Sequence, residues 1–152
     1  MIRVLKEETQ DKSNNIDADE SAYLYVSVSQ IPASGNGLHT AINIYKNEII
    51  AVFKGEILTN AQAKFRAKRN NDKYFINMLD GSVLDSMKVK CFAKYANDAK
   101  GFSSGINGLK NNSKITLDDS DNVCLIATRN IKTGEEIFCG YGSKYWEKHS
   151  VK

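Results

Sequence analysis

The sequence predicts one small, mostly β domain with a few short helices. At 152 residues, 41% hydrophobic and 26% charged, the chain has the size and composition of one ordinary globular domain. Short runs rich in β-branched and aromatic residues recur along it, separated by turn residues. No internal repeat is evident, and Pro32 is the only proline. These observations favour a compact β domain whose loops carry the chemistry.

Domain boundaries follow the change in composition. Residues 7–21 are almost wholly polar, which predicts a solvated lead-in over residues 1–20. The domain is expected over residues 21–146 and a tail over residues 147–152. The N-terminus turns polar before an apolar signal core forms, and no run approaches the roughly 18 apolar residues of a membrane span. The three cysteines are odd in number and far apart, which favours an intracellular location, cytoplasmic or nuclear.

Strands and helices are expected in the following order. A helix is predicted over residues 59–71, because Thr59 and Gln62 have the spacing of a capping box. Its lysine and arginine residues are interpreted as a solvated face. A second helix is expected within residues 91–99, and residues 100–112 predict a long loop. The predicted strands cover residues 23–31, 48–58, 73–79, 82–89, 113–118, 122–129 and 135–141.

Three familiar chemistries are excluded. Residues 101–105 match the Gly-x-Ser-x-Gly nucleophile elbow, but a chain of this length cannot hold the hydrolase sheet that such an elbow needs. His39 and His149 are too few and too isolated for a zinc site, and no phosphate-binding glycine loop is present. No metal is therefore expected.

Several other segments carry residues suited to a site built from loops. Gly35 and Gly37 would let backbone amides approach a ligand without obstruction by side chains, although the same pattern is typical of a hairpin turn. A Phe-Lys-Gly-Glu run at residues 53–56 is also typical of a strand bulge. The remaining segments are an aromatic pair at residues 74–75, Val-Leu-Asp at 83–85, Lys-Tyr-Ala-Asn-Asp-Ala at 94–99, Asn-Asn-Ser at 111–113, and Thr-Gly-Glu-Glu-Ile-Phe-Cys-Gly-Tyr-Gly at 133–142.

In this order the segments resemble the motifs of the SET domain family of protein-lysine methyltransferases. The resemblance covers residues 23–146 and is strongest at residues 133–142, which Tyr145 and Trp146 follow. Asn97 and Asn112 are also typical of turns, since asparagine readily adopts turn geometry. Their position ahead of the Gly-Glu-Glu strand favours a functional interpretation.

The resemblance implies a SET fold, which is β-clip-like, with several small sheets, short helices and a threaded C-terminal segment. It implies transfer of a methyl group from S-adenosylmethionine to a lysine side chain of a protein or peptide substrate. Tyr141 would be the catalytic residue, at the channel where the lysine meets the sulfonium. The implied cofactor-binding residues are Gly35, Asn36, Gly37, Leu38, Tyr74, Asn97, Asp98, Tyr141 and Trp146, and the implied substrate-channel residues are Tyr95, Asn112 and Cys139.

The sequence departs from the family pattern at four positions. Asp98 stands where the family has histidine, and Lys94 where it has arginine. Cys139 replaces a phenylalanine or tyrosine, and Gly140 an aspartate. Because cysteine is small and a poor hydrogen-bond partner, we expect that more than one methyl group can be added. No cysteine cluster follows, so this is a minimal form without the zinc-binding regions that flank many SET domains.

Two other functions stay open at this stage. The departures at Asp98, Cys139 and Gly140 suit a SET-like protein-binding module with weak or no catalysis. The net charge of +3 and the basic helix suit a small nucleic-acid-binding domain, although few aromatic residues interleave with the basic ones. Direct nucleic-acid and membrane partners are not expected. Exposed sheet edges of a SET core without flanking domains favour a homodimer.

Overall fold

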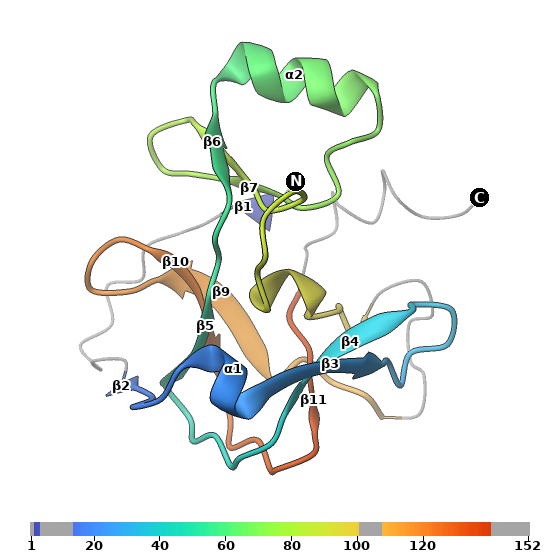
Figure 1. Ribbon diagram of the computed structural model, residues 1–152, viewed down its shortest axis with the longest axis vertical. Coiled ribbons are helices and arrows are strands. Elements are labelled where there is room, and N and C mark those ends of the chain that lie inside the picture. The colour runs from blue at the N-terminus through green and yellow to red at the C-terminus, as the bar shows by residue number, and fades with distance from the viewer. Residues whose placement is uncertain (1, 4–13, 101–107, 141–152) are drawn as a thin grey trace.

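The computed structural model describes residues 2–3, 14–100 and 108–140. In this part of the chain the strands form three small sheets, accompanied by two short α-helices and one 3-10 turn. Figure 1 shows one sheet in the upper part of the molecule, with helix α2 above it, and the other two sheets below. The expected mostly β fold of several small sheets with short helices is confirmed.

The upper sheet has the order β1-β7-β8-β6. Strand β1 pairs in parallel with β7, and the other two pairings are antiparallel. The strand bounds are β1 (Ile2–Arg3), β7 (Phe75–Asn77), β8 (Val83–Asp85) and β6 (Glu56–Leu58).

The two lower sheets enclose the main core. One has the order β2-β5-β10-β9 and the other β11-β4-β3. All five residues of β10 are buried, as expected for a central strand that is covered on both faces. The bounds are β2 (Asn14–Asn15), β5 (Glu48–Val52), β10 (Val123–Ala127), β9 (Ser113–Leu117), β11 (Glu136–Ile137), β4 (Asn36–Thr40) and β3 (Leu24–Val28), and helix α1 (Glu20–Tyr23) leads into β3.

The structure differs from the sequence expectations at several elements. Strands β1 and β2 lie within residues 1–20, which the sequence predicts to be a solvated lead-in, and each pairs with a strand of the domain. Strand β4 is not predicted, because its Asn-Gly-Leu-His-Thr sequence has little β-propensity, and its partners on both sides supply the stability. The helix expected within residues 91–99 is only the 3-10 turn η1 (Ala93–Tyr95).

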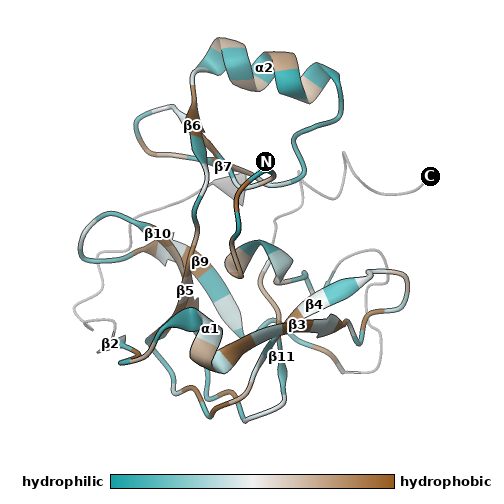
Figure 2. Ribbon diagram, viewed as in Figure 1, coloured by the Kyte–Doolittle hydropathy of each residue, from teal (hydrophilic) through white to brown (hydrophobic). Residues whose placement is uncertain are grey.

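Helix α2 (Asn60–Lys68) confirms the capping-box prediction. The Gln62 amide N–H donates to the Thr59 hydroxyl at 3.2 Å, and the Thr59 N–H donates to the Gln62 side chain at 2.9 Å. Figure 2 shows that most of this helix is hydrophilic, and Ala63 is its buried residue. Burial alone therefore attaches α2 weakly to the sheet.

Arg66 supplies the stronger attachment. Its guanidinium donates to Asp85 of β8 at 2.6 Å and to Glu56 of β6 at 2.9 Å, so one helix residue joins two strands. The Asp85 side chain is only 1% exposed. The interpretation of Arg66 as part of a solvated face is therefore wrong, because Arg66 neutralises a carboxylate that the fold has removed from water.

The segment that contains β11 is threaded between two distant parts of the chain. Asn97 bridges Phe138 on one side, and Ser113 bridges Cys139 on the other, both in parallel. The Cys139 N–H donates to the Asn97 carbonyl at 2.9 Å, and the Ser113 N–H donates to the Phe138 carbonyl at 3.0 Å. The segment thus passes between the two ends of the 98–112 connection, as the SET resemblance implied.

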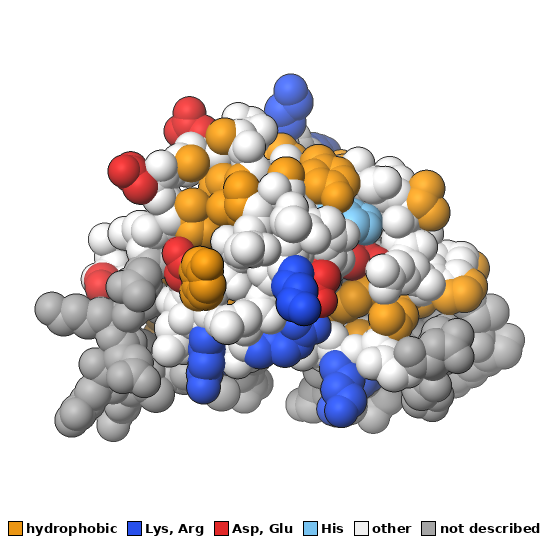
Figure 3. All heavy atoms as spheres, turned by 90° about the horizontal axis from the view of Figure 1, so that it is seen from below, with side chains coloured by type: hydrophobic (Ala, Val, Ile, Leu, Met, Phe, Trp, Pro, Cys, Tyr) orange, Lys and Arg blue, Asp and Glu red, His pale blue; other side chains and the backbone are white. Residues whose placement is uncertain are grey.

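Surface charge is mixed on the face seen from below in Figure 3. Acidic and basic side chains both occur there, and hydrophobic side chains gather between them. This face is therefore not the uniform basic surface that nucleic acids prefer.

None of the described helices has the length and apolar composition to cross a bilayer.

Candidate active site

The turn between β3 and β4 brings the first predicted motif to the surface. Gly35 has a φ of +67°, a left-handed conformation that favours glycine, and no atom lies within 4 Å of the position that its Cβ would occupy. The Ser29 N–H donates to the Gly35 carbonyl at 2.9 Å and closes the turn. The backbone at Gly35 and Asn36 lies at the surface, where it is accessible to a ligand.

Glu136 holds this turn from inside the molecule. Its side chain is 2% exposed, and its carboxylate accepts from the Ser29 hydroxyl at 2.6 Å and from the Gln30 N–H at 2.8 Å. In the described part of the chain no cation pairs with it, so its negative charge is balanced only by neutral donors. The sequence interpretation missed this role. The sequence signal that could have revealed the burial of Glu136 is its position directly before the apolar Ile137 and Phe138.

Asn97 connects the second predicted motif to the first. Its side-chain amide donates to the Asn36 carbonyl at 3.0 Å, and the same nitrogen lies 3.5 Å from a Glu136 carboxylate oxygen. Asn36 and Glu136 lie 61 and 39 positions from Asn97 in the chain, and both meet the Asn97 side chain. The structure brings together Gly35, Asn36, Gly37 and Asn97, which the sequence assigns to cofactor binding.

Asp98 organises the neighbouring loop. Its carboxylate accepts from the Lys100 N–H at 2.9 Å and from the Asn111 amide at 3.1 Å. The side-chain oxygen of Asn111 in turn accepts from the Ala99 N–H at 2.8 Å. A Cβ placed on Gly140 would lie 3.4 Å from the Asn111 amide nitrogen, so the chain arrives beside this pair immediately before Tyr141.

Asn112 does not lie where the sequence interpretation places it. The resemblance assigns it to the substrate channel, but it is 1% exposed and both of its amide atoms bind backbone. Its nitrogen donates to the Glu136 carbonyl at 2.9 Å, and its oxygen accepts from the Phe138 N–H at 2.9 Å. The side chain thus acts as an additional strand partner for β11 and is not presented to a substrate.

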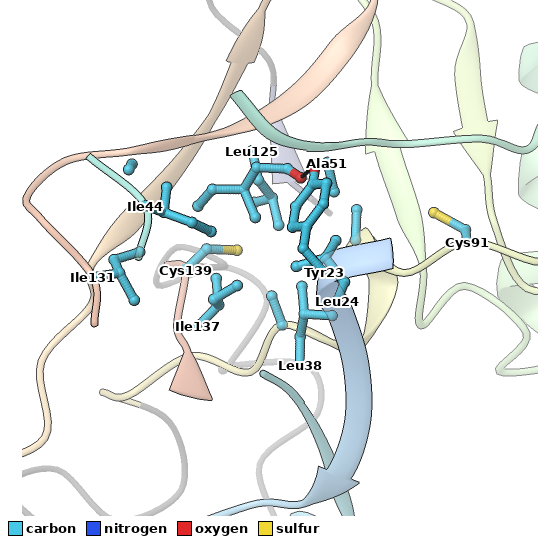
Figure 4. Close-up of a cluster of buried hydrophobic side chains, with 14 residues drawn as sticks. Tyr23, Leu24, Leu38, Ile44, Ala51, Cys91, Leu125, Ile131, Ile137 and Cys139 are labelled. Atoms are coloured by element: carbon cyan, nitrogen blue, oxygen red, sulfur yellow. Dashed lines mark hydrogen bonds between the residues drawn. The ribbon is translucent and has the colours of Figure 1, made fainter. Parts of the chain in front are cut away.

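Cys139 also differs from its expected channel position. It is 1% exposed and belongs to the main core cluster, in which Figure 4 shows its sulfur pointing inward among Ile44, Leu125 and Ile137. Burial, followed by the nearby charge of Asp98, raises the pKa of this thiol far above its usual range. The expectation that more than one methyl group can be added stays a prediction.

The other predicted side chains are divided between two places. Leu38 is fully buried in the core, so neither its side chain nor its backbone is accessible from the surface. Tyr74 lines a cavity of about 20 Å³ together with Phe53 and Ala96. Tyr95 lines a different and larger cavity. Tyr141 and Trp146 lie outside the described residues, so the predicted catalytic position is approached only as far as Gly140.

Lys94 fills the place of the family's arginine in a different way. Its ammonium donates to three carbonyls, those of Ser86 at 3.1 Å, Met87 at 3.4 Å and Val89 at 2.9 Å. These bonds hold the 86–89 turn against η1.

No group of three or more histidine, cysteine or acidic residues placed to hold a metal occurs in the described ranges.

Comparisons with known proteins agree with this geometry. The SET domain profile matches residues 35–142. No curated protein sequence gives a match. Among solved structures, "ctPRC2 in an autoinhibited conformation bound to S-adenosylmethionine" is similar with a TM-score of 0.62 and 24% identity, covering 79% of this chain.

A second solved structure gives the same result. A humanized mutant of the Chaetomium thermophilum Polycomb Repressive Complex 2, bound to an inhibitor, is similar with a TM-score of 0.62 and 25% identity over 78% of this chain. The matched region spans 15% of each of these longer chains. With more than two thirds of its sequence matched by one family profile and this fold, the chain belongs to the SET domain family.

Proposed function

We propose that this chain is a protein-lysine N-methyltransferase that uses S-adenosylmethionine. The observation that carries the proposal is the meeting of three separate motifs at one place. The Asn97 amide binds the Asn36 carbonyl, and both lie beside the buried Glu136 carboxylate. Membership of a methyltransferase family supports the same cofactor, and so does a similar solved structure that is bound to S-adenosylmethionine.

The described residues fit this cofactor. The surface backbone of Gly35 and Asn36 offers amides and carbonyls without side-chain obstruction at the glycine. Glu136 is a buried carboxylate, 2% exposed, which gives this region a negative charge. When bound, S-adenosylmethionine supplies an activated methyl group on a positively charged sulfur. Such a cation is favoured where carboxylates are held away from water.

The target lysine must lose its proton before it can attack. A free lysine has a pKa of about 10.4. An apolar entrance lowers this value by desolvation, and a nearby positive charge lowers it further. Tyr141, which follows Gly140 directly, would orient the amine through its hydroxyl, so no histidine base is required.

Two measurements test the proposal. Isothermal titration calorimetry with S-adenosylmethionine should give saturable binding, and labelled methyl transfer to a lysine-containing protein extract should follow. Tyr141→Phe should abolish transfer while leaving the circular dichroism spectrum unchanged. Tyr45→Phe is the matched control, because Tyr45 is 59% exposed on a distant loop and its loss should change neither binding nor transfer.

One alternative has support from a specific residue. Asp98 occupies the position of the family histidine, and its carboxylate binds Lys100 and Asn111 of its own loop. A SET-like protein-binding module without catalysis would show an intact fold that gives no heat with S-adenosylmethionine. That outcome would overturn the enzymatic proposal and favour the binding module.

A further inference from the structure

A long groove crosses the molecule between helix α2 and strand β3. One part, of about 740 Å³, lies between β3 and residues 87–95. A second part, of about 550 Å³, lies beside α2. Met87 and Lys88 line both parts, so the two cavities adjoin and form one elongated surface.

Several basic side chains line this groove without an ion pair in the described residues, although Lys88 lies close enough to Glu56 for their charges to attract. Lys54, Lys88 and Lys90 are exposed, and none of them forms an ion pair within those ranges. At the α2 end the Arg69 guanidinium lies 3.8 Å from the centre of the Phe65 ring, also without an acidic partner in the described part of the chain. The groove therefore offers four cations to a ligand.

Acidic groups are fewer and lie mostly at the far end. Asp85 lines the α2 part, but Arg66 neutralises it. Asp19 and Glu20 line the β3 end, and the Glu20 carboxylate accepts from the Val52 N–H at 3.2 Å. The charge is thus positive along most of the groove and negative at one end.

The floor of the groove is apolar. Met87, Val89 and Phe92 are half-buried beneath the lysines, and Val26 forms the wall on the β3 side. An occupant that alternates apolar and acidic side chains would place one set on this floor and the other set toward the lysines.

Strand β3 presents a free backbone edge at the same wall. In the described residues it pairs only with β4. The Ala41 N–H donates to the Tyr23 carbonyl at 2.7 Å, and the Ser29 N–H donates to the Gly35 carbonyl at 2.9 Å. Because alternate residues of an antiparallel strand bond to the same neighbour, the N–H and C=O groups of Val26 and Val28 point away from β4. An edge of this kind accepts another strand.

We propose that this groove binds an extended acidic segment of a protein partner, which adds to the β3 edge as a further strand. Its backbone would bond to Val26 and Val28, and its carboxylates would pair with Lys54, Lys88 and Lys90. A nucleic acid is disfavoured, because it cannot pair with a strand edge and because Asp19 and Glu20 would repel its phosphates. Peptide binding here does not require methyl transfer.

Fluorescence anisotropy with a labelled twelve-residue peptide of alternating glutamate and valine tests this proposal. Wild-type protein should bind the peptide in a salt-dependent manner. The double variant Lys88→Glu, Lys90→Glu should weaken binding about tenfold or more. The matched control is Lys46→Glu, Lys132→Glu, because both lysines are exposed but line neither cavity, and its affinity should equal that of wild type.

A second variant tests strand addition itself. Val26→Pro removes an N–H that points away from β4, so the sheet should remain folded, as circular dichroism would verify. Its affinity for the peptide should fall, and the peptide N-methylated at alternate residues should bind weakly to wild type. The proposal is overturned if the acidic peptide does not bind, if a lysine-valine peptide binds equally well, or if a twelve-nucleotide single strand binds more tightly.

Discussion

The carboxylate of Glu136 occupies the space into which a side chain at position 37 would project. A Cβ on Gly37 would lie 2.0 Å from the nearer carboxylate oxygen, far inside contact distance. Glu136 belongs to the threaded C-terminal segment and Gly37 to the turn that would hold the cofactor. The glycine is therefore required for packing between two segments, in addition to any contact with a ligand.

Gly37→Ala should destabilise the protein by about 2 kcal/mol, because the added methyl group displaces a buried carboxylate from its donors. Urea unfolding followed by circular dichroism measures the change. Ser34→Ala provides a control in the same turn, and its midpoint should stay near that of wild type. Equal midpoints for Gly37→Ala and wild type would contradict the close approach.

Glu136→Gln should cost about 1 to 3 kcal/mol, because the new amide nitrogen cannot accept from Ser29, Gln30 and Asn97 as a carboxylate oxygen does. Affinity for S-adenosylmethionine should fall as well, since the turn loses its support and the site loses a negative charge. Calorimetry measures both effects. Glu135→Gln is the neighbouring control. The Glu135 side chain is 38% exposed, so this substitution should change stability and affinity only slightly.

Asn112→Ala should cost about 3 kcal/mol, because it leaves the Glu136 carbonyl and the Phe138 N–H without the partner that Asn112 supplies. Hydrogen exchange should increase at residues 136–139 more than in β10. An unchanged exchange pattern would show that the threaded segment does not depend on this side chain. Asn122→Ala, in an exposed turn, should have little effect.

Arg66→Gln should lower the melting temperature of the protein, because the buried Asp85 carboxylate would lose the cation that lies beside it. Arg69→Gln is a suitable control, since Arg69 only stacks on the exposed Phe65 ring. Thermal unfolding of the two variants should separate them clearly. Similar melting temperatures would mean that α2 is held by other contacts.

The Tyr23→Phe variant should be less stable than wild type at neutral pH, and this difference should become smaller as pH rises. Burial, followed by the charges of Glu20 and Glu48, raises the pKa of Tyr23 to about 12. The folded state favours the neutral phenol. The contribution of Tyr23 to the free energy of unfolding is therefore fully present below pH 10 and is lost as pH approaches 12. The variant lacks the bond to the Ile50 carbonyl and should be about 1 kcal/mol less stable at neutral pH. Urea unfolding of both proteins across the alkaline range measures this difference in stability. A difference that does not change with pH would contradict the raised pKa of Tyr23.

Local patterns were sufficient for most of the elements. Short runs rich in β-branched and aromatic residues predict the positions of β3, β5, β7 and β10, because such runs suit a pleated, buried surface. The capping box of α2 is equally readable, since its two bonds join residues three positions apart. Strand β4 escapes prediction because partners at β3 and β11, rather than its own residues, stabilise it.

By itself the sequence determined the order of the motifs, and with it the family, the small-sheet fold and the cluster of Gly35, Asn36, Gly37 and Asn97. Only the tertiary structure decided the roles of Asn112, Cys139, Glu136 and Arg66. Each of these roles depends on partners 10 to 107 positions away or on the interior of the core. Residue type specifies which bonds a side chain is able to form, but the threading of the chain determines which groups lie within reach.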